Sequence, residues 1–172
     1  MDHAGPSSVC DASLASLAAT GRFAARLAAA IDAVAAPHGT RQDTLWIGLF
    51  GEVGAGKTTL TACLVPALQH LGWPSDGPEE VASPTYAIEH HYLRGTLLHA
   101  DLYRLSEARL PQLSLLDTSA NAALVEWPER IGAVAELLDV ELHLEVVSKQ
   151  RRKVRVLGKT PRGAALVRAL AG

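Results

Sequence analysis

The stretch GEVGAGKTTL, residues 51–60, constrains the fold of this chain more than any other part of its sequence. It matches the phosphate-loop (P-loop) pattern Gly-x4-Gly-Lys-Ser/Thr, and the apolar run LWIGLF at 45–50 comes directly before it. Leucines at helical spacing follow the loop and end at Gly72. The pattern therefore predicts a buried strand, a phosphate-binding turn and a helix from Lys57 to about Leu71.

The residue types of the loop suit a nucleotide. Glycines let the backbone turn so that successive N–H groups point at phosphate oxygens, and the helix N-terminus adds partial positive charge. We expect Lys57 to contact the β and γ phosphates and Thr58 to offer its hydroxyl to Mg²⁺. A glycine-rich turn that binds nothing is the alternative, and the strand and helix on either side disfavour it. The expected nucleotide-binding residues are Gly51, Glu52, Val53, Gly54, Ala55, Gly56, Lys57, Thr58 and Thr59.

The rest of the chain alternates strand and helix patterns. Strands are predicted at 13–19, 45–50, after the SPTY turn, and at 96–100, 122–125, 141–147 and 153–157. Helices are predicted after Thr20 and at 57–71, 106–116 (flawed by Pro111), 133–138 and 162–171. This alternation predicts an α/β fold: a single P-loop NTPase domain with a mostly parallel sheet flanked by helices.

Two acidic residues end apolar strands of this predicted sheet. Asp101 follows LLHA, and Glu126 follows AALV. The carboxyl ends of parallel strands meet at one edge, so both acids should converge with Gly51. Either could bind Mg²⁺, directly or through water, while the other orients the attacking water. Each acid alone would more often be a strand-end cap.

The sequence gives a weaker indication of which nucleotide base the site would recognise. Asn121 is the only asparagine and is followed by Ala122, so the guanine-reading Asn-Lys-x-Asp motif is absent and ATP is the expected nucleotide. Trp127 could stack on adenine or simply pack in the core. Thr85, in SPTY, lies where a switch loop would contact the γ-phosphate, with an ordinary proline turn as the alternative.

Three histidines lie close together in the sequence, at 90, 91 and 99. Their spacing, without a cysteine or a fourth residue, does not indicate a metal site, so we interpret them as structural or surface residues.

Charge and cysteine content add weaker constraints. Residues 149–172 hold eight Lys or Arg and no acid, so the first 148 residues carry eight basic and eighteen acidic groups. The basic end could meet an acidic partner such as RNA, but an ordinary solvated segment is the favoured interpretation. Cys10 and Cys63 have no metal or disulfide spacing, and the alanine-rich run 23–36 is too short and too charged to span a bilayer. We therefore expect a cytoplasmic protein without a membrane segment.

Four motifs in order, GEVGAGKTT at 51–59, SPTY at 83–86, HADLYRL at 99–105 and LVEWPER at 124–130, resemble the TsaE (YjeE) family, the bacterial ATPases of tRNA threonylcarbamoyladenosine biosynthesis. The resemblance extends from about residue 13 to 157. It implies a weak ATPase, using ATP and Mg²⁺, that is activated by a heterodimer of the threonylcarbamoyl-transfer machinery and meets tRNA only through that complex. The modified adenosine would be the one beside the anticodon, in tRNAs reading codons that start with A.

The resemblance also assigns residues. It implies that Lys57, Thr85, Asp101 and Glu126 are catalytic, that Thr58, Asp101 and Glu126 hold the metal, and that Trp127 and Arg152 lie by the nucleotide, although Arg151 is an alternative to Arg152. Residues 1–12 would be an N-terminal extension and 13–172 the ATPase domain. A small-molecule P-loop kinase is the main alternative, but it would need an arginine-bearing lid, and the dense pair Arg151–Arg152 lies at a predicted strand start. A nucleotide-binding scaffold without turnover is the third possibility.

Overall fold

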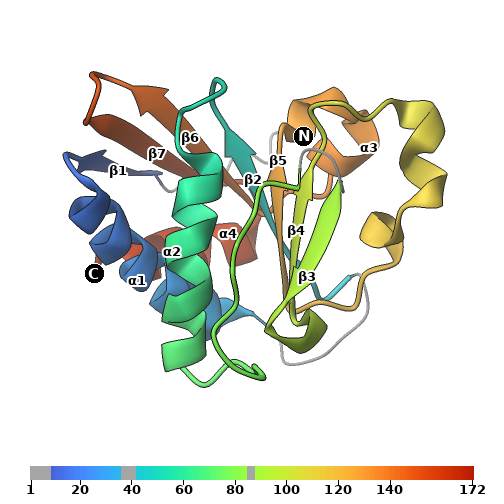
Figure 1. The fold of residues 1–172 in the computed structure, drawn as a ribbon, viewed down its shortest axis with the longest axis horizontal. Coiled ribbons are helices and arrows are strands. Elements are labelled where there is room, and N and C mark those ends of the chain that lie inside the picture. Colours follow the sequence, from blue (N-terminus) through green and yellow to red (C-terminus); the bar gives the residue numbers. More distant parts are fainter. Residues whose placement is uncertain (1–8, 36–41, 85–87) are drawn as a thin grey trace.

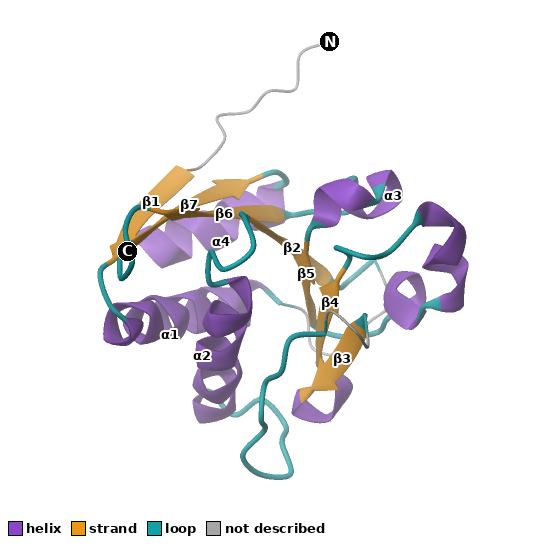
Figure 2. Ribbon diagram, turned by 45° about the horizontal axis from the view of Figure 1, so that its top comes forward, coloured by secondary structure: helices purple, strands orange, loops and turns teal. Residues whose placement is uncertain are grey.

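A seven-stranded sheet runs through the molecule with helices on both faces (Figure 1, Figure 2). The computed structural model describes residues 9–35, 42–84 and 88–172. The spatial order of the strands is β1-β7-β6-β2-β5-β4-β3. In chain order they are β1 (Val9–Leu14), β2 (Leu45–Phe50), β3 (Glu89–Tyr92), β4 (Leu97–Asp101), β5 (Ala122–Glu126), β6 (Val140–Val146) and β7 (Arg152–Gly158).

The predicted α/β fold is confirmed, and its sheet is parallel at the centre with antiparallel pairings at both sides. The four central strands, β6, β2, β5 and β4, are parallel to one another. The outer pairings, β1 with β7, β7 with β6, and β3 with β4, are antiparallel. Short connections join β3 to β4 and β6 to β7, and a short connection between neighbouring strands gives an antiparallel pair. The parallel centre is what brings the expected site residues to one edge.

Helices α1 (Leu17–Val34), α2 (Lys57–His70) and α4 (Pro161–Ala171) contribute to one hydrophobic core on one face of the sheet. The short α3 (Gly132–Ala135) and the 3₁₀ turns at 107–112, 114–117 and 128–130 lie with the second core on the other face. Side chains alternate across a strand, so Leu45, Ile47 and Leu49 of β2 enter the first core and Trp46 the second. β2 is thus fixed from both sides directly before the loop that it feeds.

The elements around the phosphate-binding loop agree closely with the sequence predictions. β2 has the predicted bounds, and α2 begins at Lys57 as expected and ends one residue early. Leu60, Leu64 and Leu68 are buried along the inner face of α2, whereas Leu71 lies beyond the helix and is exposed.

The first strand and the start of the first helix were predicted at the wrong positions along the chain. The first strand is Val9–Leu14 rather than 13–19, and Thr20 lies inside α1. Ser16 is the cap instead, because its hydroxyl accepts the N–H of Ala19 at 3.1 Å. The boundary that the sequence suggested after residue 12 therefore falls within a strand paired to β7, and residues 1–8 lie outside the described ranges.

The helix predicted at 106–116 is also absent as such. Two 3₁₀ turns, 107–112 and 114–117, replace it. Pro111 has no N–H to donate and cannot continue a regular helix, which accounts for the break. The helix predicted at 133–138 is a single turn at 132–135.

Candidate functional site

The carboxyl ends of β2, β4 and β5 meet at one edge of the sheet, as the sequence predicted. Asp101 and Glu126 are paired in register on β4 and β5, and Glu126 is paired with Leu49 of β2. A cavity of about 350 Å³ opens there. Its lining residues are Val53, Gly54, Gly56, Lys57, Thr58, Thr59, Ser83, Asp101, Tyr103, Arg104, Glu126 and Trp127.

The backbone of the loop is shaped for close approach. Gly51 has φ +138°, and a Cβ there would lie 2.4 Å from the carbonyl oxygen of Leu144, so only glycine fits. Gly56, in the left-handed region at φ +102°, precedes α2 and makes no side-chain cap. The first N–H groups of α2 thus receive no cap from that position, which is the arrangement that binds phosphate.

Lys57 is the buried cation of the site, with 5% of its surface exposed. Its Nζ donates to the carbonyl oxygens of Gly51 at 2.6 Å and Glu52 at 3.1 Å. Burial lowers the pKa of the Lys57 ammonium, while the nearby carboxylates of Glu126, Asp101 and Glu129 act to raise it. These acids help to keep Lys57 charged in a poorly solvated place.

The two buried acids differ in their contacts. Oε1 of Glu126 accepts a hydrogen bond from the Thr58 hydroxyl at 3.0 Å, and it lies 2.9 Å from Nε2 of His99. Oδ1 of Asp101 accepts the backbone N–H of Tyr103 at 2.9 Å. The geometry therefore joins Glu126, rather than Asp101, to the threonine of the loop.

These residues fit a magnesium ion held mainly by oxygen and by the phosphates of a nucleotide. Thr58 gives its hydrogen to Glu126, which leaves its oxygen lone pairs available to a cation. Among the described residues, no three His, Cys, Asp or Glu side chains form a metal cluster. Mg²⁺ needs none, since it keeps several waters and is bound by one or two carboxylates plus substrate phosphates.

His99 is a site residue that the sequence interpretation missed. It is fully buried and contacts Glu126, whereas His91 of β3 is exposed. His90, also on β3, bonds the Tyr92 hydroxyl at 3.1 Å. Strand alternation was the available signal, because residues 99 and 101 of one strand point to the same face.

Trp127 lies at the lysine end of the cavity. The Lys57 ammonium is 4.2 Å from the centroid of its ring, and the ring of Tyr103 is 5.0 Å away. Trp127 has φ +58°, an unusual conformation for a tryptophan. This position favours a role beside the phosphates over the adenine stacking that the sequence suggested. Tyr103 and Arg104, which also line the cavity, were not singled out from the sequence although they belong to HADLYRL.

Arg152, at the start of β7, reaches the loop from the other side. Its Nε donates to the carbonyl oxygen of Ala55 at 3.2 Å. It lines a second cavity of about 430 Å³, which shares Gly56 and Thr59 with the first. Arg151 is exposed, so Arg152 is the arginine beside the loop. The other lining residues are Leu14, Ser16, Leu17, Thr20, Ala55, Leu144, Lys149 and Gln150.

Thr85 lies outside the described residues, so its expected contact with the γ-phosphate stays a prediction. Ser83, two residues before it, lines the cavity with Lys57 and Asp101.

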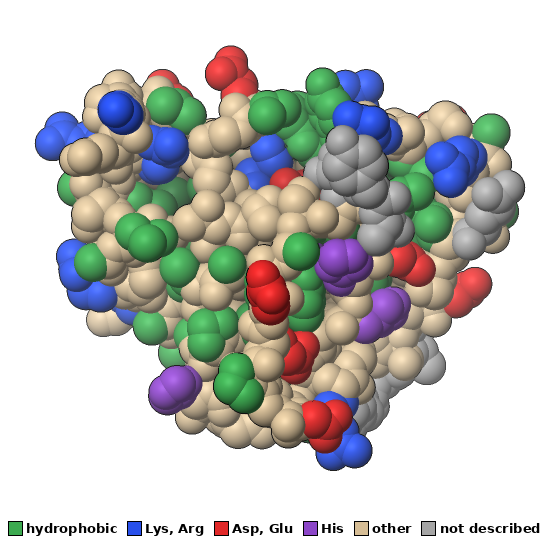
Figure 3. All heavy atoms as spheres, viewed as in Figure 1, with side chains coloured by type: hydrophobic (Ala, Val, Ile, Leu, Met, Phe, Trp, Pro, Cys, Tyr) green, Lys and Arg blue, Asp and Glu red, His purple; other side chains and the backbone are tan. Residues whose placement is uncertain are grey.

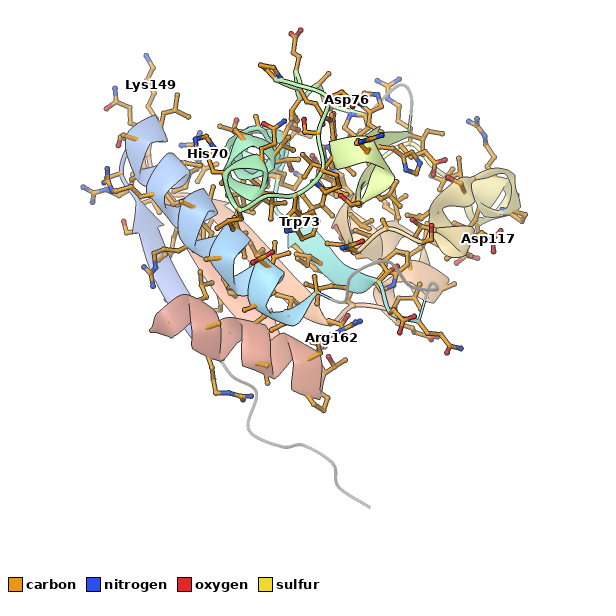
Figure 4. The ribbon with its side chains drawn as sticks, turned by 90° about the horizontal axis from the view of Figure 1, so that it is seen from below. His70, Trp73, Asp76, Asp117, Lys149 and Arg162 are labelled. Carbon is orange, nitrogen blue, oxygen red and sulfur yellow. The ribbon has the colours of Figure 1, made fainter. Side chains whose placement is uncertain are left out.

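The basic residues of the C-terminal segment do not all lie together. Figure 4 shows Lys149 and Arg162 far apart, and Figure 3 shows basic side chains scattered among acidic and apolar ones. Arg155 pairs with Asp11 at 2.9 Å, and Arg162 pairs with Asp139 at 2.7 Å. These contacts favour the ordinary structural interpretation over a nucleic-acid surface.

No helix within the described ranges is long and apolar enough to cross a membrane.

Comparison with known proteins gives one consistent family. The sequence model described as "Threonylcarbamoyl adenosine biosynthesis protein TsaE" matches residues 14–155. A Streptomyces coelicolor protein named tRNA threonylcarbamoyladenosine biosynthesis protein TsaE is 38% identical over 139 residues, covering 72% of this chain and 87% of its own. A Haemophilus influenzae protein of the same name is 27% identical over 133 residues, covering 74% and 79%.

A solved structure, described as Bacillus subtilis YdiB, superposes with a TM-score of 0.66 over 98% of this chain and 97% of its own. At 20% sequence identity, this likeness supports the fold alone.

Proposed function

Since the chain belongs to the family of threonylcarbamoyl adenosine biosynthesis protein TsaE, we propose that it is a magnesium-dependent ATPase serving threonylcarbamoyl modification of tRNA. The observation that carries the proposal is the arrangement of Lys57, Thr58 and Glu126 at the carboxyl edge of the sheet, where Lys57 and Glu126 are buried. Lys57 lies inside the phosphate-binding loop, and Thr58 donates to Glu126 at 3.0 Å. A glycine-rich turn without a ligand would need no buried lysine and acid at this place.

Each residue then has a physical role. The N–H groups of the loop and of the first turn of α2 hold the phosphates, and Lys57 moves from the Gly51 and Glu52 carbonyls to the terminal phosphate oxygens. Bound Mg²⁺ would neutralise developing charge on the phosphates, held by Thr58 and Glu126. Asp101, which lines the same cavity as Thr58 and Glu126, is the candidate for orienting the attacking water.

We place the base and ribose in the second cavity. It adjoins the opposite side of the loop at Gly56 and Thr59, so a nucleotide whose phosphates lie in the loop can extend into it. Leu14, Leu17 and Leu144 supply apolar contacts there. Trp127 stays at the phosphate end, where its ring contacts Lys57.

A kinase is the less favoured alternative. Kinases of this size close an arginine-bearing lid over the phosphates, but Arg152 is tied by Nη1 to the Ser148 carbonyl at 3.0 Å and by Nε to the loop. Arg104 lines the cavity that would hold the phosphates. It is the candidate for an arginine, supplied by the chain itself, that stabilises the charge on the transferred phosphate.

The proposal of partner proteins follows from the family to which the chain belongs. We propose that slow hydrolysis by the single chain is accelerated by a heterodimer of the threonylcarbamoyl-transfer machinery in the cytoplasm, and that tRNA is met through that complex. Val53 at the tip of the loop is 75% exposed and Tyr103 is 38% exposed, so apolar surface borders the site.

The experiment is a phosphate-release assay on the purified chain with ATP and Mg²⁺, combined with a search for labelled phosphate on small acceptors. If the chain is an ATPase, phosphate is released to water and none is transferred to an acceptor, and Lys57→Ala loses this release. Transfer to an acceptor would favour the kinase. ATP binding with no turnover, alone or with partners, would favour the scaffold.

A further inference from the structure

A single oxygen atom of Glu126 is held from two directions. Oε1 accepts the Thr58 hydroxyl, from the start of α2, at 3.0 Å. The same atom lies 2.9 Å from Nε2 of His99, in the middle of β4. His99 is fully buried, and Glu126 is 3% exposed.

The form of His99 follows from its neighbours. An ionised carboxylate only accepts, so Nε2 must carry the hydrogen in this contact. Nδ1 is buried and has no hydrogen-bond partner among the described residues. A hydrogen on Nδ1 would be a buried donor without a partner, which is more costly than an unused lone pair. Nε2 of His99 therefore donates to Glu126, and the ring of Tyr92 lies 6.3 Å from the ring of His99.

The support for this contact is rigid. Residue 99 is paired with Leu124 in the β4–β5 register, two residues before the pairing of Asp101 with Glu126. Both strands are central and parallel, and all five residues of each are buried. Glu126 is the last residue of β5, and its long side chain can adopt several rotamers. A fixed donor on the neighbouring strand can select one of these rotamers.

We propose that His99 is a positioning residue, whose Nε2–H fixes the carboxylate of Glu126 in the orientation that binds Thr58 and the magnesium ion. This inference rests on the proposed function, because the orientation matters only if Glu126 serves a metal. Losing a hydrogen-bond partner that orients a metal-binding side chain typically costs about 10–100-fold in metal affinity or activity. A buried histidine kept only for packing would not need its polar atom on the acid of the site.

The test compares three substitutions in the full chain. His99→Gln can place an amide N–H close to the position of Nε2, His99→Asn is too short to reach, and His99→Leu keeps the volume without a donor. The measured quantity is the affinity for a fluorescent ADP analogue, once with Mg²⁺ and once with EDTA. The ratio of the two dissociation constants isolates the metal's contribution from the loop's own hold on the phosphates.

We expect His99→Leu and His99→Asn to lose about 10–100-fold of the magnesium-dependent affinity, with the affinity in EDTA unchanged and turnover reduced by a similar factor. His99→Gln should retain most of both. His91→Leu, an exposed histidine on the neighbouring strand, is the matched control and should behave as the unmodified protein.

The outcomes separate the two proposals. If the unmodified chain gains no affinity from Mg²⁺, the proposed function fails, and this inference fails with it. If the unmodified chain gains affinity but His99→Asn and His99→Gln gain equally, the positioning role is wrong and the proposed function stands. Should His99→Leu not fold, the comparison of Asn with Gln decides, because the two differ by one methylene.

Discussion

Replacing Glu126 with glutamine should remove magnesium-dependent hydrolysis and, in the absence of metal, stabilise the fold. The reason is the charge of the buried site. Glu126 and Asp101 are 3% and 4% exposed, and the buried cation between them is Lys57 alone among the described residues. Glu126→Gln removes one of two carboxylates that are held out of water, where the ionised form is costly.

Two opposing effects set the magnitude. A bond to an ionised acceptor is worth about 1.5–3 kcal/mol and one to a neutral acceptor about 0.5–1.5 kcal/mol. Weakening the bonds from Thr58 and His99 therefore costs about 2 kcal/mol in total. Taking a carboxylate out of water costs several kcal/mol. The net effect of Glu126→Gln in EDTA is a gain of about 1–2 kcal/mol in the free energy of unfolding, which raises Tm by roughly 2–8 °C.

Thermal unfolding of Glu126→Gln in EDTA, and in ADP with Mg²⁺, is the assay. The unmodified chain should gain more stability from ADP with Mg²⁺ than from ADP with EDTA, whereas the variant should gain equally from both. Glu129→Gln is the matched control: it removes a charge near Lys57 from an exposed position and should leave Tm unchanged. A variant that is clearly less stable than the unmodified chain in EDTA, or that still hydrolyses ATP with Mg²⁺, would refute the reasoning.

Three further changes test other parts of the structure. Lys57→Ala should abolish hydrolysis and weaken ATP binding; turnover at the unmodified rate would disprove the site assignment. The fluorescence of Trp127 should change when ADP draws the Lys57 ammonium from its ring, and a flat titration would contradict that movement. Gly163→Ala should destabilise the fold by about 3 kcal/mol or more in urea unfolding, because a Cβ would lie 1.8 Å from the Asp139 carbonyl oxygen. Gly21→Ala, which meets open space, is its control and should not destabilise the protein.

The sequence predicted that Gly51, Asp101 and Glu126 meet at one edge of the sheet because its signals are local. A P-loop pattern is a run of consecutive residues. Asp101 and Glu126 each end an apolar strand, so a parallel sheet brings them to one edge, and this can be predicted without knowing the strand order. The candidate-site residues Lys57, Thr58 and Glu126 could all be named in this way.

What the sequence could not predict depends on neighbours distant in the chain. The contact of His99 with Glu126 depends on the β4–β5 register, which single-strand patterns do not contain. The placement of Trp127 by Lys57 depends on one left-handed residue after β5. The antiparallel pairings of β3 with β4 and of β6 with β7 follow from their short connections. The cap of α1 is Ser16 and not Thr20, although serine and threonine suit the cap position about equally well.

We propose that the site at the carboxyl edge hydrolyses ATP and that partner proteins accelerate this hydrolysis. The most direct measurement is the rate of phosphate release by the full chain, alone and with the presumed heterodimer of the threonylcarbamoyl-transfer machinery, with Lys57→Ala as the blank. We expect slow phosphate release by the chain alone and a strong increase with the heterodimer, and we expect no such increase for Lys57→Ala. Equal rates with and without the heterodimer would contradict it.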